Sequence, residues 1–283
     1  MDYNISPLRY PGGKAKLYKY VVTLLETNNL IGETYIEPFA GGAGLALRLL
    51  INGNVKKIVI NDLDPAIYSF WYCVLNDTEN FCHLIETVQI TPVEWQKQKK
   101  IYMAGLDNNL LEYAFATFFL NRTNVSGVIM GGMIGGLEQK GKYKIDARFN
   151  RQDLIARIRL IAKYKKQIVL TNLDAKDFLS AQNLRKYYKT FINLDPPYVK
   201  KGKQLYKNAF SLEDHKELRD IIGNCSRNWI VTYDICDFIN ELYSSFRRSF
   251  IDINYSVRGN RKANEYIFFS PKLILPPIIN IKE

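Results

Sequence analysis

The residues best suited to chemistry form the run Asp195-Pro196-Pro197-Tyr198, which directly follows the apolar segment TFINL. Consecutive prolines lack two amide hydrogens and fix the backbone. The Asp195 carboxylate and a backbone carbonyl are therefore expected to face one amino group and accept its two hydrogens. Its nitrogen lone pair then stays available to attack an electrophilic methyl group, and the Tyr198 ring offers a stacking surface for a flat base. The alternative is a plain turn at a strand end.

A second candidate site is the glycine-rich segment EPFAGGAG, which precedes the apolar stretch LALRLL. Glycines at a strand-to-helix turn let the backbone approach a ligand, which makes Phe39, Gly41 and Gly42 candidate contacts. Asp62 follows at the spacing of an acid that accepts the ribose hydroxyls of an adenosine-containing ligand. Asp64 is its competitor, or a helix cap. No Lys-Ser or Lys-Thr follows the glycines, so the segment favours a nucleoside without a triphosphate; the alternative is a tight turn.

Short apolar runs ending in Gly, Asn, Asp or Pro are expected to position both sites. Such runs, rich in Ile and Val, are typical of strands buried on both faces of a parallel sheet. The predicted strands are Thr34–Phe39, Lys57–Asn61, Gln167–Thr171, Thr190–Asp195 and Asn228–Tyr233. Ligands of open α/β sheets bind at the carboxyl ends of the strands, where Asp62 and Asp195 lie.

Two further patterns complete the predicted fold. Ser211–Ile222 reads as a helix that opens with a capping box, Ser211 with Asp214, and stops at Gly223. Ser249–Tyr255 and Glu265–Ser270 suggest an antiparallel hairpin at one edge of the sheet. We therefore expect an α/β fold with a seven-stranded mixed sheet and flanking helices.

More than a hundred residues separate the second and third predicted strands, which is far more than a crossover needs. We expect residues 76–160 to form an inserted lobe, and residues 1–75 and 161–283 to form the main domain. The lobe reads as helical at Leu110–Leu120 and then turns glycine-rich and basic, GVIMGGMIGGLEQKGKYKIDARFNR. A mobile loop for a partner is the functional interpretation, and an irregular surface loop is the alternative.

Composition bears on partners and location. The 283 residues carry a formal charge of +11 and 47% hydrophobic residues, enough for a sizeable core. A basic protein gains by displacing counterions from nucleic acid, although a solvated surface explains the charge equally well. No apolar run spans a bilayer, and no basic amphipathic helix suggests a membrane surface. The spacing of the four cysteines and two histidines favours neither a metal site nor disulfides. With no apolar signal core at the N-terminus, we expect a cytoplasmic protein.

The order of these motifs resembles the Dam-type DNA adenine-N6 methyltransferases (D12 class, alpha group). Arg9-Tyr10-Pro11-Gly12-Gly13-Lys14 is similar to that family's opening motif, EPFAGGAG to its second, and NDLD to its acidic ribose motif. Leu120-Asn121-Arg122 is similar to its lobe motif, Asn172-Leu173-Asp174 to its loop near the cofactor adenine, and RKANEYIF to its late hairpin. The family's DPPY tetrad corresponds to residues 195–198. The resemblance covers most of the chain.

The resemblance implies a Rossmann-like methyltransferase fold with an inserted, mainly helical DNA-recognition lobe. It implies S-adenosylmethionine as methyl donor, double-stranded DNA as partner, and adenine N6 as target. The target adenine must be flipped out of the duplex to be reached, and transfer would be a direct SN2 step without metal. Tyr10, Lys14, Asp62 and Asp195 would line the pocket, with Lys14 near the methionine carboxylate and Tyr10 near the sulfonium. Asp174 would accept from the cofactor's adenine amino group, or would instead cap a helix.

The lobe departs from the family pattern of members that read GATC, because no F-N-V-P stretch follows NVSGVIMGGMIGG. This absence argues against GATC as the recognition site. The expected DNA contacts combine basic residues of the lobe with motif residues. They are Asn121, Arg122, Lys142, Arg148, Arg151 and Arg261, with an ordinary solvated face as the alternative for each basic residue.

Alternatives remain within and outside this class. Methylation of another planar amino group, such as cytosine N4, RNA adenine or a glutamine amide, would use the same tetrad. A cytosine-C5 enzyme would need a Pro-Cys nucleophile, and no cysteine follows a proline. A catalytically inactive DNA-binding relative is the alternative of another class. The sequence leaves open whether a cognate restriction endonuclease accompanies the protein.

Overall fold

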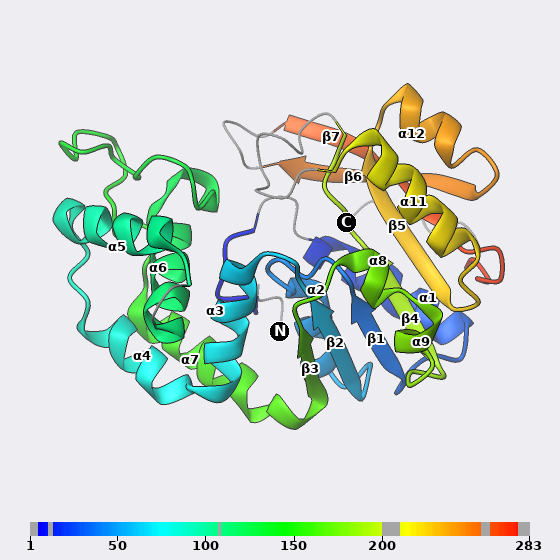
Figure 1. Ribbon diagram of the computed structural model, residues 1–283, viewed down its shortest axis with the longest axis horizontal. Helices are drawn as coiled ribbons and strands as arrows, with labels where there is room; N and C mark the ends of the chain where they lie inside the picture. The colour runs from blue at the N-terminus through cyan, green and yellow to red at the C-terminus, as the bar shows by residue number, and fades with distance from the viewer. Residues whose placement is uncertain (1–4, 11–13, 107–108, 200–209, 256–260, 277–283) are drawn as a thin grey trace. The chain divides into compact units, whose positions relative to one another are not determined.

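The computed structural model describes residues 5–10, 14–106, 109–199, 210–255 and 261–276 (Figure 1). The chain divides into two compact units. Residues 12–64 and 167–283 form one, which we call the sheet unit, and residues 1–11 and 65–166 form the other, the helical unit. No described helix is both long and apolar enough to cross a lipid bilayer.

The sheet unit contains a seven-stranded mixed sheet with the strand order β3-β2-β1-β4-β5-β7-β6. Strands β1 to β5 run parallel, and β7 runs antiparallel to both β5 and β6. The strands are β1 Thr34–Glu37, β2 Lys57–Asn61, β3 Ile168–Thr171, β4 Thr190–Leu194, β5 Asn228–Asp234, β6 Arg247–Tyr255 and β7 Arg261–Phe269. This arrangement confirms the predicted fold class. Asp195 lies one residue beyond β4, which leaves its side chain at the carboxyl edge.

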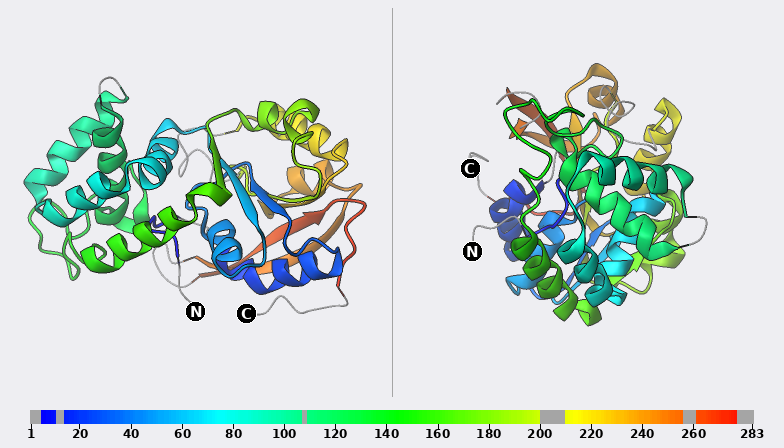
Figure 2. Two further views of the ribbon diagram at one scale, coloured as in Figure 1. Left: turned by 90° about the horizontal axis from the view of Figure 1, so that it is seen from below. Right: turned by 90° about the vertical axis from the view of Figure 1, so that its left-hand side faces the viewer.

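Continuous apolar runs form these strands because both faces of the sheet are covered. Every residue of β1 and β4 is buried. Figure 2 shows α1 and α2 on one side of the sheet and α8, α9 and α11 on the other. The helical elements of this unit are η1 Lys14–Leu17, α1 Tyr18–Thr27, α2 Gly44–Ile51, α8 Ala175–Phe178, α9 Ala181–Leu184, α11 Leu212–Gly223 and α12 Asp237–Leu242. The capping box predicted at Ser211 and Asp214 is present at the start of α11.

The helical unit is built around aromatic side chains. Phe70, Phe81 and Phe118 contact one another, and Phe149 packs on Phe118 with ring centroids 5.6 Å apart. The helices of this unit, drawn from cyan to green, lie against one another in both further views (Figure 2). They are α3 Pro65–Asn76, α4 Thr78–Thr87, α5 Pro92–Ala104, α6 Leu110–Thr123, η2 Val125–Gly127 and α7 Arg151–Lys163, and η3 Lys165–Gln167 links α7 to β3.

The division between the units differs from the expected boundaries after residues 75 and 160. The chain passes from the sheet unit to the helical unit between Asp64 and Pro65, and returns to the sheet unit between Lys166 and Gln167. Helix α3 belongs to the helical unit because it packs on α6 and α7. Residues 1–11 also belong to it, since Asn121 pairs with the Arg9 backbone. Such long-range packing has no signature in the local sequence.

Candidate active site

The tetrad Asp195-Pro196-Pro197-Tyr198 lies at the carboxyl end of β4, as its sequence predicts. The Oδ1 atom of Asp195 accepts from Lys14 Nζ at 2.8 Å, Thr232 Oγ1 at 3.0 Å and Tyr198 OH at 3.4 Å. None of the residues that the structure describes donates to Oδ2. The side chain of Asp195 is 22% exposed. One carboxylate oxygen is therefore held by the protein, and the other remains an acceptor for a ligand.

The hydroxyl group of Tyr198 contacts both Lys14 and Asp195. Its ring is 5% exposed and belongs to the hydrophobic core of the sheet unit. The hydroxyl accepts from Lys14 Nζ at 2.7 Å and lies within 3.4 Å of Asp195 Oδ1. The ring is thus covered in this structure, so it offers less of a stacking face than the sequence suggested. Both prolines are buried as well.

Lys14 is the buried cation of the site. Its side chain is 3% exposed and lies between Asp195 and Glu265, with Nζ 3.4 Å from Glu265 Oε2. Burial by itself lowers the pKa of Lys14, but the two carboxylates outweigh it and raise the pKa above its ordinary value. Burial raises the pKa of Asp195, and the Lys14 ammonium opposes that rise. Lys14 therefore favours the charged form of Asp195 and orients its side chain. To hold a cofactor carboxylate, it would have to leave one of these partners.

Sequence reasoning missed three buried polar residues, of which Glu265 and Thr232 support the tetrad and Glu37 pairs with Tyr35. Glu265 of β7 is buried opposite Asp234 of β5, and Thr232 is a buried residue of β5. Glu37, the last residue of β1, accepts from Tyr35 OH at 3.2 Å. Burial is the main reason that the pKa of Glu37 rises to about 8. Acidic side chains inside apolar strands such as TYIE and NEYIFF are the signal for such residues, because buried charges are rare without a partner.

The glycine-rich turn after β1 is built around Asp62. Gly41 has a φ of 45°, in the left-handed region where only glycine is unstrained. Its amide donates to Asp62 Oδ2 at 2.8 Å, and the Asp64 amide donates to Oδ1 at 3.0 Å. Burial is the largest cause that raises the pKa of Asp62 to about 7. Each carboxylate oxygen keeps a second acceptor position, as a ribose diol requires. Phe39 packs edge-on against Phe210 beside this turn.

Asn61 joins three loops at this edge of the sheet. Its amide donates to Pro38 O and Leu173 O, and its oxygen accepts from the Leu173 amide and from Thr171 Oγ1. Every hydrogen-bonding position of the buried side chain is thereby occupied within the protein. Asn61 therefore fixes the loops after β1, β2 and β3 relative to one another. It was not singled out from the sequence, although it opens the NDLD motif.

Asp174 caps a helix. Its Oδ1 accepts from the Lys176 amide at 2.8 Å at the start of α8. Of the two roles that the sequence left open, the structure therefore displays the cap. Asn172 ties the same loop to the ribose motif by donating to the backbone oxygens of Asp62 and Leu63.

Several residues that were expected to contact DNA form hydrogen bonds within the helical unit. Asn121 is buried and pairs with both the amide and the carbonyl of Arg9. Arg122 donates to the carbonyl of Arg148, and burial is the main cause that lowers the pKa of Arg122 to about 9. Arg151 donates to the carbonyls of Ile85, Glu86 and Val88 at the end of α4. These side chains satisfy backbone groups that α4 and the loops leave unpaired.

The remaining candidates fall into three groups. Lys142 and Arg148 are exposed and flank the Tyr143 ring, each 5.8 Å from its centroid. Tyr10 is half-buried in the helical unit. Arg261 begins β7, but its side chain lies outside the described residues.

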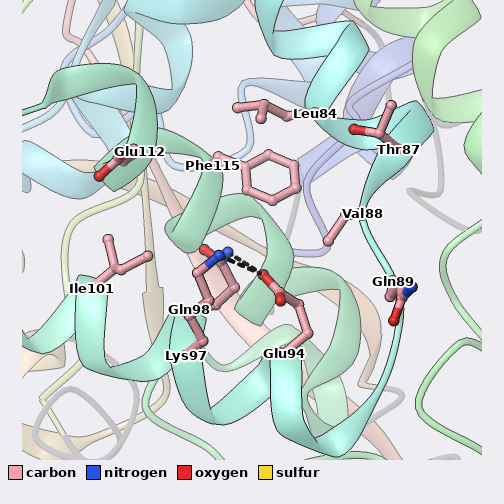
Figure 3. A pocket seen from close by; sticks show the side chains of 10 residues that line it. All are labelled: Leu84, Thr87, Val88, Gln89, Glu94, Lys97, Gln98, Ile101, Glu112 and Phe115. Carbon is pink, nitrogen blue, oxygen red and sulfur yellow. Dashed lines mark hydrogen bonds and ion pairs between the residues drawn. The ribbon is translucent and has the colours of Figure 1, made fainter.

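A separate hollow of about 400 Å³ opens in the helical unit (Figure 3). Its walls come from α4, α5 and α6, and Gln98 donates to Glu94 along α5 at 2.7 Å. None of the residues expected at a catalytic, cofactor or DNA site lines it. Among the described residues, no cluster of His, Cys, Asp and Glu is arranged to hold a metal ion.

Comparison with known proteins identifies relatives. The family model described as D12 class N6 adenine-specific DNA methyltransferase matches residues 10–257. The chain is 23% identical over 205 residues to the Type II methyltransferase M.MjaIII of Methanocaldococcus jannaschii, covering 68% of each chain. It is 22% identical over 227 residues to the Type II methyltransferase M.CviBI of Paramecium bursaria Chlorella virus NC1A, covering 75% of this chain and 77% of that one. The rRNA methyltransferase aviRa from Streptomyces viridochromogenes aligns with a TM-score of 0.38 and 12% identity over 92% of this chain and 86% of that one.

Proposed function

We propose that this chain, which belongs to the D12 class of N6 adenine-specific DNA methyltransferases, transfers a methyl group from S-adenosylmethionine to an adenine flipped out of duplex DNA. The observation that carries the proposal is the Asp195 carboxylate, whose Oδ1 accepts from three protein donors while none of the described residues donates to Oδ2. A carboxylate held in this way is preorganised to receive a hydrogen-bond donor without rearranging during the reaction.

The residues of the tetrad suit an amino group as nucleophile. Oδ2 of Asp195 accepts one N6 hydrogen, and a backbone carbonyl of the tetrad accepts the other. The nitrogen lone pair is then directed at the methyl carbon, so that the N–C bond forms as the C–S bond breaks. N6 afterwards loses one proton, and the carboxylate oxygen already in contact with it is the nearest acceptor. No covalent enzyme intermediate is needed.

The donor site that we propose lies at the turn after β1. S-adenosylmethionine supplies an electrophilic methyl group on a sulfonium. Asp62 fits its ribose diol, because both carboxylate oxygens are fixed by amides and each keeps an acceptor position. Phe39, Gly41 and Gly42 would line the same turn. We assign Tyr10 to this pocket from its motif alone, and Asp174 to the adjoining loop.

Double-stranded DNA is the proposed partner of the helical unit. Lys142 and Arg148, exposed beside Tyr143, are suited to phosphates or base edges. Arg261 remains a proposed contact on the basis of its motif. Both relatives are named Type II methyltransferases, which supports a place beside a restriction endonuclease. We expect the protein in the cytoplasm.

The product of the reaction tests the proposal. Purified protein is incubated with S-adenosylmethionine and mixed-sequence duplex DNA, and the nucleosides are analysed by mass spectrometry. We expect N6-methyladenine, and Asp195→Ala should reduce its rate of formation by roughly 10² to 10³. N4-methylcytosine, methylation of RNA only, or near-full turnover by the folded Asp195→Ala protein would each contradict it. Cofactor binding without any methylation would instead indicate an inactive DNA-binding relative.

A further inference from the structure

The edge of the sheet opposite to the tetrad carries a concentration of basic side chains. Strands β1, β2, β4 and β5 are parallel, so they all begin along this edge. Basic residues immediately precede three of these strands: Lys56 precedes β2, the run Arg185-Lys186-Tyr187-Tyr188-Lys189 precedes β4, and Arg227 precedes β5. We call Lys56, Arg185, Lys186, Lys189 and Arg227 the basic edge.

Two sets of contacts occur among these residues, one around Glu33 and one around Arg227. Lys56 Nζ lies 3.1 Å from Glu33 Oε2, and Lys189 Nζ lies 3.9 Å from Glu33 Oε1. The two lysines therefore converge on a single carboxylate, and their side chains are still 65% and 60% exposed. Arg227 donates to Leu184 O at 3.4 Å, next to Arg185, and its guanidinium lies 5.9 Å from the Tyr188 ring. That ring is 81% exposed.

The charge of this surface is not cancelled locally. The strand order also brings the acids Glu26, Glu33, Asp220 and Glu241 to this edge, and Asp220 is paired with Arg219 at 2.9 Å. Glu33 is the one that contacts members of the basic edge. Between β2 and β5 the members are spread over three strand spacings, or about 14 Å. Four of these cations are exposed and Arg227 is half-buried, and an array over such a distance matches a rigid row of phosphates.

We propose that the basic edge binds the phosphate backbone of a second DNA duplex, while the tetrad at the opposite edge of the sheet acts on the first. The proposal rests on the DNA methylation proposed above and adds a second, sequence-independent contact to it. Duplex DNA is favoured by charge complementarity, because it carries one negative charge per about 1.7 Å of axis and releases counterions on binding. Holding two segments would let the enzyme pass from one to the other without diffusing freely.

Duplex capture tests the proposal. A biotinylated duplex that the wild type methylates is immobilised, and enzyme is bound to it with S-adenosylhomocysteine to prevent turnover. A fluorescent duplex that the wild type does not methylate is then added. We compare the wild type with Arg185→Glu/Lys186→Glu and with the control Lys19→Glu/Lys216→Glu. The control makes the same change in charge at exposed positions of α1 and α11. Arg185→Ala/Lys186→Ala is a milder second variant should the first one unfold.

The wild type and the control should capture the second duplex, and the edge variants should capture about tenfold less. The salt dependence of capture should fall by about one unit for each phosphate that a variant no longer neutralises. Methylation of a short duplex should be unchanged in all variants. Equal capture by edge variant and control, as expected if the enzyme bridged duplexes by self-association, overturns the proposal. So does absence of capture by the wild type, which would make an acidic protein segment the fitting partner. If the wild type methylates no DNA at all, that result contradicts the proposed function and not the binding of a second duplex.

Discussion

Replacing Lys14 by methionine would remove the buried cation beside the tetrad. Lys14 Nζ lies 2.8 Å from Asp195 Oδ1 and 3.4 Å from Glu265 Oε2. With an effective dielectric constant near 20, these distances correspond to attractions of about 6 and about 5 kcal/mol. The cost of burying the charges offsets much of this, and removing one partner of a buried ion pair typically costs about 3–5 kcal/mol. We expect thermal or urea unfolding to show a loss of that size in the Lys14→Met protein.

The same substitution should shift the pH dependence of methyl transfer. Lys14 lowers the pKa of Asp195, whereas burial and Glu265 raise it. Without the ammonium, burial and Glu265 still raise the pKa of Asp195 and the Thr232 hydrogen bond alone opposes them, so Asp195 becomes ionised at a higher pH. The acidic limb of the rate profile for Lys14→Met should therefore move to higher pH, and activity at neutral pH should fall. Rates measured from about pH 5 to pH 9 with saturating substrates would reveal the shift.

A second substitution shows whether the effects of Lys14→Met come from the lost charge or from disturbed packing. Glu265→Gln removes the carboxylate that opposes ionisation of Asp195 and that Lys14→Met leaves without its cation. The double variant should therefore be more stable than Lys14→Met alone, with a coupling of about 1–3 kcal/mol, and its acidic limb should return toward lower pH. The reasoning is refuted if the stability losses of the two single variants add to that of the double variant within about 0.5 kcal/mol. It is also refuted if the double variant is less stable than Lys14→Met.

Three further predictions concern other parts of the site. Burial raises the pKa of Asp62 to about 7, and a ribose diol donates best to the ionised carboxylate. The affinity for S-adenosylmethionine, measured by calorimetry, should therefore rise from about pH 6 to pH 8 and then level off. The Asp62→Asn protein should bind S-adenosylmethionine weakly at every pH in this range. Arg151→Met should lower stability by about 1–3 kcal/mol while leaving the DNA affinity of the folded protein unchanged, because Arg151 bonds carbonyls of its own unit; weaker DNA binding at unaltered stability would contradict this. Lys142→Ala and Arg148→Ala should each reduce the salt slope of duplex binding by about one unit, and unchanged slopes in both would move the DNA contact elsewhere.

Elements with strong local signals were predicted well from the sequence. The apolar runs around Tyr35 and Ile192 became fully buried central strands, and the capping box at Ser211 opened a helix where expected. The positions of Asp62 and Asp195 at strand ends also follow from the sequence. In a parallel sheet the end of an apolar run is the end of a strand, and the carboxyl ends of parallel strands share one edge.

What the candidate residues do was less predictable, because a side chain's role depends on which groups reach it. Lys14, Glu265 and Thr232 are distant in the sequence and meet at Asp195 only because η1, β7 and β5 are neighbours in the fold. Arg122 was expected to contact DNA from the lobe motif, and Arg151 from the basic segment. The folded unit instead directs them to its own carbonyls.

The sequence by itself determined the class of fold, the order of the strands along the chain and the acids at the sheet edge, since these depend on local periodicity and motif spacing. Tertiary structure alone decided which oxygen of Asp195 is filled, which arginines are engaged by the fold, and where the helical unit begins. Local patterns specify how a segment can fold. The burial of a charge and the partner that compensates it are properties of segments brought together by packing, so they exist only in the folded chain.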